Sequence, residues 1–201
     1  MNKVELLDKC NNSLGEGITF SSTDNYLYWL DIGNKSKLYK LDLSSNKKEI
    51  FELPEIVTAT SIKSQDELIL ATNNGLKLFN TSNAKFESVV TIEDEQTLTR
   101  SNDGASDAYG RFWFGTMQNN FDDNGNGIPI KDNIGKLYRV DTNRKISIIE
   151  EGLGIPNTFV WSPDNNNFYF SDTLKGTILS YNFELENGEL SNKKELASFN
   201  R

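Results

Sequence analysis

The sequence has 201 residues, of which 36% are hydrophobic and 25% are charged, and it carries a net charge of −8. This composition is ordinary for a globular protein and excludes disorder as a default. Nucleic-acid binding needs clustered Lys and Arg to neutralise phosphates, and the negative charge argues against it. No apolar run approaches the roughly 20 residues that a membrane helix needs, so we expect neither nucleic acid nor a membrane as a partner.

Histidine is absent from the sequence, and Cys10 is its only cysteine. Ser-His-Asp and Cys-His nucleophile pairs are therefore excluded, and so is a zinc site built from Cys and His. Any metal must be held by oxygen atoms of Asp, Glu, Asn, backbone or water, which favours calcium, magnesium or manganese. Residues 1–10 lack the apolar stretch of a secretory signal, and a lone cysteine fits a reducing compartment, so we predict a cytoplasmic location.

Short aromatic and β-branched runs recur along the chain, bounded by Asn, Asp, Gly and Ser, and they indicate strands rather than helices. Four units each begin with a strand, a polar turn and a second strand, in chain order at residues 17–31, 60–72, 107–115 and 158–172. A third strand follows in each unit, at residues 37–42, 75–79, 136–141 and 177–181. A fourth strand completes the unit, as at residues 145–150.

Four strands per unit, repeated every roughly 40–50 residues, are typical of β-propeller blades. A β-sandwich would not require the same unit four times. We therefore predict an all-β fold, with residues 1–201 forming a single propeller domain of about four four-stranded antiparallel blades. Residues 195–201 look like a final blade strand, and four-bladed rings are at the small end of the range, so we expect closing C-terminal blades to be missing. An open ring exposes blade faces and edges through which chains could self-associate.

Three motifs lie in these units in a fixed order. They are Leu14–Gly17 with Tyr28–Ile32, Arg100–Gly104 with Asp107 and Gly110–Met117, and Ile155–Asn157 with Trp161–Asp164 and Phe168–Asp172. Each motif alone is weak, but the three in order resemble the gluconolactonase/regucalcin (senescence marker protein) family of metal-dependent lactonases. The resemblance implies a six-bladed propeller, here C-terminally incomplete, that hydrolyses a small sugar-type lactone or a related ester.

The resemblance also implies roles for five residues. Glu16 and Asn157 would be ligands of one divalent metal ion at the mouth of the central channel. Arg100 and Asn102 would contact the lactone substrate, and Asp103 would hold their loop or reach the metal through water. We expect these residues in loops that enter the innermost strands of different blades. Calcium is the expected ion because a carboxylate and an amide oxygen suit a hard cation, with magnesium, manganese or zinc as alternatives.

The sequence departs from the family pattern at three points. The further acidic ligand of the family, which doubles as catalytic base, belongs to a later blade, so the base in this chain is unknown. Asn120 stands where some relatives have an acidic substrate contact, and Asn157 is followed by Thr158 where Asn-Gly is common. The rival hypothesis is therefore a non-catalytic or truncated propeller that keeps the scaffold without the activity.

Other conspicuous residues have structural interpretations. The aromatic pairs are expected in the blade cores, at Tyr28–Trp29, Phe112–Trp113 and Phe168–Tyr169. Asp31 and Asp172 end aromatic strands, and we expect them to accept hydrogen bonds from backbone amides in the turn.

The segment Asp122–Gly127 places oxygen side chains at the first, third and fifth positions of a loop and glycine at the sixth, as calcium loops do. The twelfth position is Asn133 rather than a bidentate Glu, and no helices flank the loop. We therefore interpret it as a mobile insertion at the channel mouth.

Overall fold

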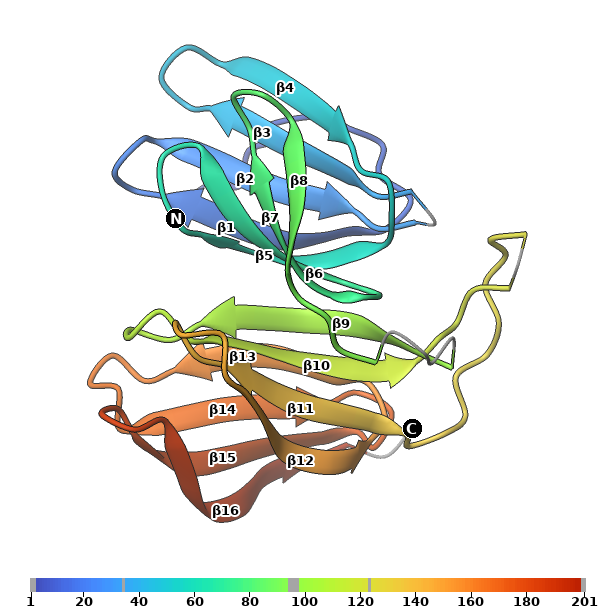
Figure 1. Ribbon diagram of the computed structural model, residues 1–201, viewed down its shortest axis with the longest axis vertical. Helices are drawn as coiled ribbons and strands as arrows, with labels where there is room; N and C mark the ends of the chain where they lie inside the picture. Colours follow the sequence, from blue (N-terminus) through green and yellow to red (C-terminus); the bar gives the residue numbers. More distant parts are fainter. Residues whose placement is uncertain (1–2, 34, 94–97, 123, 200–201) are drawn as a thin grey trace.

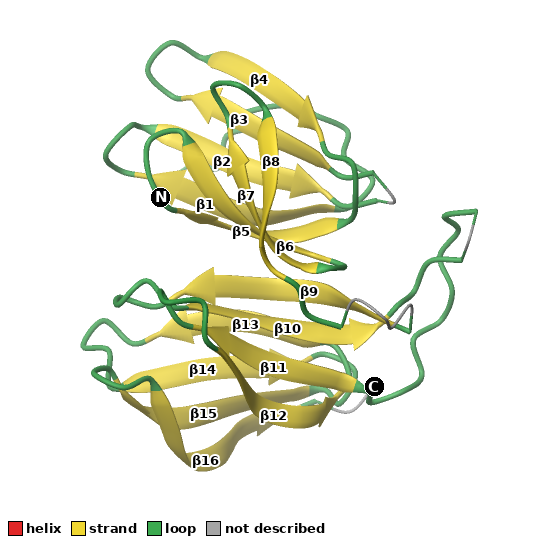
Figure 2. Cartoon of the chain, viewed as in Figure 1, coloured by secondary structure: helices red, strands yellow, loops and turns green. Residues whose placement is uncertain are grey.

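The computed structural model describes residues 3–33, 35–93, 98–122 and 124–199. These residues form sixteen strands and no helix (Figures 1 and 2). The strands are β1 (Gly15–Ser21), β2 (Tyr26–Asp31), β3 (Lys37–Asp42), β4 (Lys47–Glu52), β5 (Val57–Ile62), β6 (Glu67–Thr72), β7 (Gly75–Asn80), β8 (Lys85–Val90), β9 (Thr99–Ser106), β10 (Phe112–Gln118), β11 (Gly135–Val140), β12 (Ile146–Leu153), β13 (Pro156–Trp161), β14 (Asn167–Asp172), β15 (Thr177–Glu184) and β16 (Glu189–Ser198).

Each group of four consecutive strands forms one antiparallel sheet, in the orders β1-β2-β3-β4, β5-β6-β7-β8, β9-β10-β11-β12 and β13-β14-β15-β16. We call these sheets blades 1 to 4. Strands that are adjacent in sequence are also adjacent in the sheet, so each blade is a meander of hairpins. Asn25, Asn46 and Asn165 take left-handed backbone conformations in the turns, with φ of 58°, 58° and 56°, which Asn tolerates better than other non-glycine residues. The predicted β-propeller of four-stranded antiparallel blades is confirmed.

The first strand of each blade lies at the inside of the ring. β1 and β5 lie at the lower side of the upper pair of blades in Figure 1, and β9 lies at the upper side of the lower pair. Hydroxyl groups connect the innermost strands of neighbouring blades. The Thr19 and Thr60 hydroxyls are 3.0 Å apart between β1 and β5, and those of Thr58 and Ser101 are 2.7 Å apart between β5 and β9.

Apolar cores fill the three junctions between consecutive blades. Examples are Leu30 with Leu70 between blades 1 and 2, Ala71 with Phe114 between blades 2 and 3, and Trp113 with Phe168 between blades 3 and 4. Full burial of one such side chain contributes roughly 1.5–3 kcal/mol, so the junctions hold the ring together. The predicted core position of the aromatic pairs is confirmed, except that Tyr169 is half-buried.

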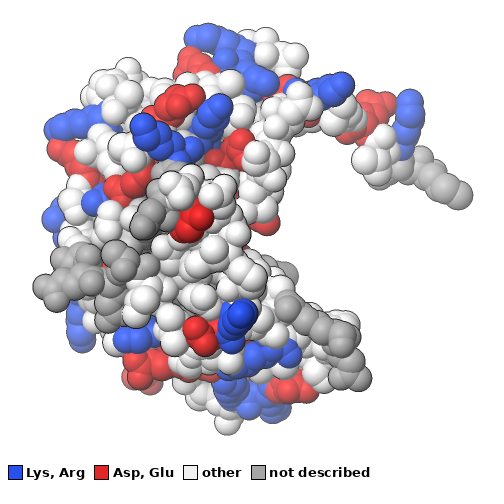
Figure 3. Space-filling view, turned by 90° about the vertical axis from the view of Figure 1, so that its right-hand side faces the viewer, with Lys and Arg blue, Asp and Glu red and all other residues white. Residues whose placement is uncertain are grey.

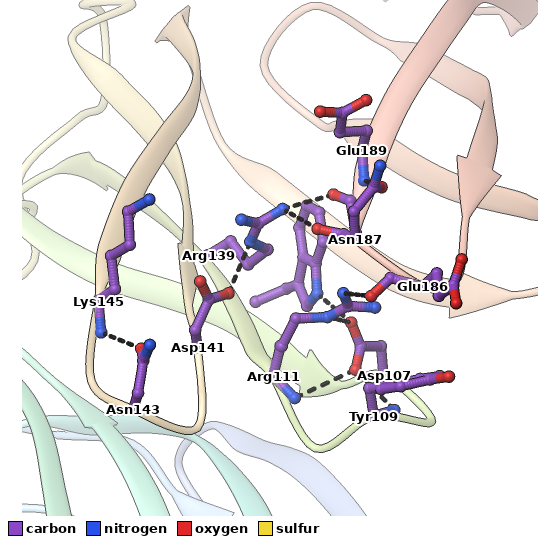
Figure 4. Close-up of polar contacts among 12 residues, drawn as sticks. Asp107, Tyr109, Arg111, Arg139, Asp141, Asn143, Lys145, Glu186, Asn187 and Glu189 are labelled. Atoms are coloured by element: carbon purple, nitrogen blue, oxygen red, sulfur yellow. Dashed lines mark hydrogen bonds and ion pairs between the residues drawn. The ribbon is translucent and has the colours of Figure 1, made fainter.

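A polar network fastens the outer edge of the junction between blades 3 and 4 (Figure 4). Asp107 accepts hydrogen bonds from Arg111 Nε at 2.6 Å and from Trp113 Nε1 at 2.9 Å. Arg111 and Arg139 then donate to backbone carbonyls of residues 185–188, between β15 and β16, each at 2.7 Å. Asp107, part of the second sequence motif, is therefore a buried structural acceptor whose charge is balanced by Arg111.

The ring is open between blade 4 and blade 1. Among the described residues, no apolar cluster joins these two blades. The outer face of blade 1 instead carries Trp29 stacked on Tyr39, with ring centroids 4.9 Å apart, and Cys10 packs against them. The surface seen in Figure 3 is hollowed between an upper and a lower part of the molecule. The described part of the chain contains no helix of the length and apolarity that crossing a membrane requires.

Candidate functional site

Every innermost strand contains a β-bulge. In each case the strand holds one residue more than the neighbouring strand opposite it. The bulges lie between Glu16 and Thr19 in β1, Val57 and Ala59 in β5, Ser101 and Gly104 in β9, and Asn157 and Val160 in β13. Because a bulge bends the strand and redirects side chains, this repeated feature is suited to building a site on the ring axis.

The predicted site residues lie inside strands, at these bulges or, for Arg100, just before one. Glu16 is in β1, Asn157 is in β13, and Arg100, Asn102 and Asp103 are in β9. The expectation that they occupy loops before the innermost strands is therefore wrong. The aromatic pattern indicated the regularly paired part of each strand. It gave no sign that the strand begins earlier and contains one extra residue in a bulge.

Glu16 and Asn157 have the same local setting. The residue after each is left-handed, with φ of 62° at Gly17 and 63° at Thr158. A glycine adopts this conformation without strain, whereas a β-branched residue with positive φ is an outlier that surrounding contacts must hold in place. The two candidate metal ligands thus stand on equivalent bulges of the first and fourth blades.

Hydrogen bonds connect the predicted substrate contacts to Asn157. Asn102 Nδ2 donates to Asn157 Oδ1 at 3.1 Å and to the carbonyl of Pro156 at 2.9 Å. Arg100 Nη1 lies 3.4 Å from Asn102 Oδ1, and Asn157 Nδ2 donates to Thr173 Oγ1 at 2.8 Å. These contacts orient both carboxamides and bring three of the five predicted residues together.

Arg100 is nearly inaccessible, with 4% of its surface exposed. Its Nε donates to Asn120 Oδ1 at 2.8 Å, and its guanidinium carbon lies 5.5 Å from the centre of the Phe121 ring. Burial lowers the pKa of Arg100 to about 10. Phe121 also packs against the core of blades 1 and 2, so the segment after β10 covers Arg100 while reaching across the ring.

Asp103 connects β9 to β13. Its Oδ1 accepts from the backbone N–H of Gly104 at 2.8 Å, and its Oδ2 accepts from that of Thr158 at 2.9 Å. Burial raises the pKa of the Asp103 carboxyl, and the negative charge of Glu16 raises it further.

An open cavity of about 1110 Å³ runs along the innermost strands of the four blades. Glu16, Asp103 and Thr158 line it from blades 1, 3 and 4, whereas Arg100, Asn102 and Asn157 do not. Arg100, Asn102 and Asn157 are thus linked by hydrogen bonds, whereas Glu16 and Asp103 face the cavity. The coordination of one ion by both Glu16 and Asn157 remains a prediction.

The donor atoms fit a hard cation in kind. Glu16 is an exposed carboxylate, and Asn157 Oδ1 retains one lone pair after accepting from Asn102. Both are oxygen ligands of the type that calcium takes, but calcium needs roughly six to eight of them. The described residues contain no group of three Asp, Glu, Cys or His side chains placed to hold a metal ion. Water, substrate or further protein oxygens would have to complete such a site.

Two structural predictions outside this group can be compared with the structure. Asp172 accepts from the backbone N–H groups of Leu174 and Lys175 in the turn, so its predicted role is confirmed. Asp31 Oδ1 also accepts from a backbone amide, but that amide belongs to Leu14, which lies outside the turn. In the loop at Asp122, that carboxylate accepts from the backbone N–H groups of Asn124 and Asn126. The Asp122 carboxylate therefore stabilises the backbone of its own turn.

Sequence inspection missed the polar residues that support the bulges. Thr58 and Ser101 form a buried hydroxyl pair between β5 and β9, and Ser171 Oγ donates to the carbonyl of Asn157 at 2.9 Å. Thr58 is the bulge residue of blade 2, equivalent in position to the candidates of the other blades. Comparison of the four repeat units position by position could have singled out Thr58, whereas Ser171 has no distinguishing sequence signal.

The fold and the site define an open β-propeller with oxygen and amide side chains gathered at bulges of its innermost strands. Residues 14–201 match the sequence profile of the SMP-30/gluconolactonase/LRE-like region. The chain therefore belongs to the SMP-30/gluconolactonase/LRE-like family, and the predicted family resemblance is confirmed.

Individual relatives agree with this assignment. The chain is 26% identical to a putative sugar lactone lactonase of Bacillus subtilis (strain 168) and 29% identical to 6-deoxy-6-sulfogluconolactonase of Pseudomonas putida, in each case over 94% of this chain and 61% of the relative. The crystal structure of the calcium-binding protein regucalcin from Agrobacterium tumefaciens superposes with a TM-score of 0.83 at 26% identity, covering 94% of this chain and 61% of that one. The chain thus spans about three-fifths of the length of these proteins.

Proposed function

We propose that the protein takes part in hydrolysis of a small sugar-type lactone or related ester, assisted by one divalent cation at Glu16 and Asn157. The observation that carries this proposal is that Glu16, Asn102, Asp103 and Asn157 lie at the bulges of three blades, with Glu16 and Asp103 lining one cavity and Asn102 hydrogen-bonded to Asn157. Relatives named as lactonases support the reaction, and the calcium-binding relative supports calcium as the ion.

The roles of the side chains follow from their contacts. A divalent cation would supply polarisation of the lactone carbonyl and would lower the pKa of a water molecule. Asn102 lies beside Asn157 and is the proposed substrate contact. Arg100 is buried outside the cavity, so its proposed role is to orient the Asn102 carboxamide, and its predicted contact with the lactone would require Asn120 and Phe121 to move. Fixed donors of this kind reduce the entropy lost when a substrate is oriented for attack. We assign no residue of this chain as the catalytic base.

Calcium binding tests the first half of this proposal. Titration calorimetry would be performed on the 201-residue protein, Glu16→Gln, Asn157→Ala and the control Glu87→Gln. Glu87 is an exposed acid on the outermost strand of blade 2, so its removal matches the charge change away from the site. We expect both site variants to weaken calcium binding at least roughly tenfold and the control to leave it unchanged. Equal affinities in all four proteins would contradict the cation site.

Turnover tests the second half. Hydrolysis of gluconolactone and other aldonolactones would be followed with calcium, magnesium, manganese and zinc. We expect slow hydrolysis that Glu16→Gln abolishes, because one carboxylate and one amide give a divalent ion little negative charge. Calcium binding without any turnover above that of Glu16→Gln would favour the non-catalytic propeller.

A further inference from the structure

Thr158 is the most strained residue of the candidate site. It has φ of 63° in the bulge of β13, directly after the candidate ligand Asn157. Non-glycine residues in this left-handed conformation are strained, and β-branched side chains are especially disfavoured there. Such a conformation persists only where neighbouring groups hold it, so contacts to Thr158 must compensate the strain.

Asp103 supplies the strongest of these contacts. Its Oδ2 accepts from the N–H of Thr158 at 2.9 Å, across 55 positions of sequence. Its Oδ1 is fixed at the same time by the N–H of Gly104 at 2.8 Å, so the carboxylate is anchored on β9. Hydrogen bonds to a charged acceptor are stronger than those between neutral groups. The Ser171 hydroxyl, 3.2 Å from Thr158 Oγ1, is a weaker second contact.

The conformation of Thr158 determines where Asn157 points. Rotation of Thr158 to the ordinary negative φ region would remove the bulge geometry, because the extra residue of the bulge is accommodated there. The Asn157 side chain would then point elsewhere. It would lose the hydrogen bond from Asn102 to its Oδ1 and the hydrogen bond from its Nδ2 to Thr173 Oγ1. Blade 1 needs no such contact, because Gly17 adopts the same φ without strain.

We propose that Asp103 is a positioning residue that holds Thr158 in its left-handed conformation and thereby aims the carboxamide of Asn157 at the candidate site. The part of this proposal that concerns cation binding rests on the proposed function, whereas the part that concerns the Thr158 backbone does not. Asp103 acts through Asn157 and is not itself the ligand in this scheme.

The test uses Asp103→Ala, Asp103→Asn, Thr158→Gly and the double variant Asp103→Ala/Thr158→Gly. The control Asp164→Ala removes one exposed acid from the β13–β14 turn of the same blade. Nuclear magnetic resonance measures the backbone of residue 158 through its Cα and Cβ shifts and its HN–Hα coupling. We expect Asp103→Ala to shift Thr158 away from left-handed values and to accelerate its amide exchange roughly tenfold or more. Unchanged Thr158 parameters in Asp103→Ala would overturn the proposal.

Calcium titrations of the same variants separate positioning from ligation. We expect Asp103→Ala to weaken binding roughly tenfold and Thr158→Gly to restore it in the double variant, because glycine keeps the bulge without the contact to Asp103. Asp103→Asn retains one acceptor oxygen, so a smaller loss is expected. Equal losses in Asp103→Ala, Asp103→Asn and the double variant would show that Asp103 acts by its charge and would overturn the positioning role. Absence of calcium binding in the unmodified protein would refute the cation site, while the Thr158 parameters would still decide whether Asp103 holds the backbone.

Discussion

The innermost strands of blades 1 and 4 contain the same kind of bulge but stabilise it in different ways. Both carry a one-residue bulge with a candidate ligand followed by a left-handed residue. In blade 1 the left-handed residue is Gly17, and Glu16 before it is exposed. In blade 4 it is Thr158, held by Asp103, and both ends of the Asn157 carboxamide are hydrogen-bonded. The site thus combines one ligand that depends on local backbone freedom with one that depends on contacts between blades.

The segments that precede β1 and β13 are also held to different extents, the first by Asp31 and the second by Asp172. Among the residues that the structure describes, Asp31 accepts a backbone hydrogen bond from Leu14 at 2.9 Å, a contact that is exposed to water. Asp172 is 1% exposed and accepts from backbone N–H groups on both sides of β14, including Gly154 at 2.8 Å and Leu174 at 3.1 Å. Blade 4 is therefore the more tightly fastened of the two, and tertiary contacts carry more of its local geometry.

The largest expected difference between the two blades is the response to Asp→Asn substitution at these positions. Asp172→Asn replaces one acceptor oxygen by an NH₂ group, so it removes the charge and leaves a buried N–H such as that of Gly154 without its acceptor, and it should lower the free energy of unfolding by about 3 kcal/mol. Asp31→Asn, its counterpart, should cost about 1 kcal/mol or less because the hydrogen bond from Leu14 is exposed to water. Urea denaturation of both variants measures this difference. Equal losses would show that the blades are fastened alike.

Asp172 should also make stability dependent on acid. Burial raises the pKa of its carboxyl, but hydrogen bonds from the N–H groups of Gly154 and Ile155 outweigh burial and leave the pKa below its ordinary value. The stabilisation is therefore complete above the unfolded-state pKa of about 3.9 and is lost as pH falls through the lower folded-state value. Unfolding free energies measured from pH 5 downward should fall less steeply in Asp172→Asn than in the unmodified protein. Parallel curves would contradict this assignment.

A second, smaller difference should appear when blade 1 receives the residue of blade 4. Gly17→Thr places a β-branched side chain at φ of 62°, and a Cβ there lies 3.2 Å from Leu30 Cδ1. Left-handed strain of roughly 1–2 kcal/mol and this close contact should together cost about 2 kcal/mol of stability. Ile18→Thr is the matched control, since Ile18 is an exposed neighbour at ordinary φ and should change stability by only about 0.5 kcal/mol. Comparable losses in both variants would show that left-handed strain is unimportant in this bulge.

The reverse exchange should have the smallest effect. Thr158→Gly relieves left-handed strain of roughly 1–2 kcal/mol but adds roughly 0.5–1 kcal/mol of chain entropy to the unfolded state. The net change should be a stabilisation of less than about 1 kcal/mol, opposite in sign to that of Gly17→Thr. A thermal melt compares the two variants directly. Marked destabilisation by Thr158→Gly would mean that the Thr158 side chain contributes more than the strain removes.

Much of the scaffold was predictable from local pattern. The third strand of blade 1 was predicted at residues 37–42 and is observed at Lys37–Asp42, and that of blade 3 was predicted at 136–141 and is observed at Gly135–Val140. Strand periodicity and turn residues are properties of adjacent residues, so they can be read without knowing the fold. The site residues were placed in loops because a bulge leaves no such periodic signal, and its position depends on the register with the neighbouring strand.

The sequence by itself determined the four repeated units, the order of the three family motifs and the types of side chain that could carry the chemistry. A chain without histidine and with one cysteine is restricted to oxygen ligands for a metal, whatever its fold. Only the tertiary structure decided that Asp103 meets the backbone of Thr158, that Asn102 meets Asn157 and that Arg100 is covered by Asn120 and Phe121. Two of these contacts join blade 3 to blade 4, and the third joins β9 to the segment after β10. The contacts between blades exist only after the apolar junctions have placed the blades side by side. Packing between distant segments, rather than local propensity, therefore aims the side chains of the candidate site.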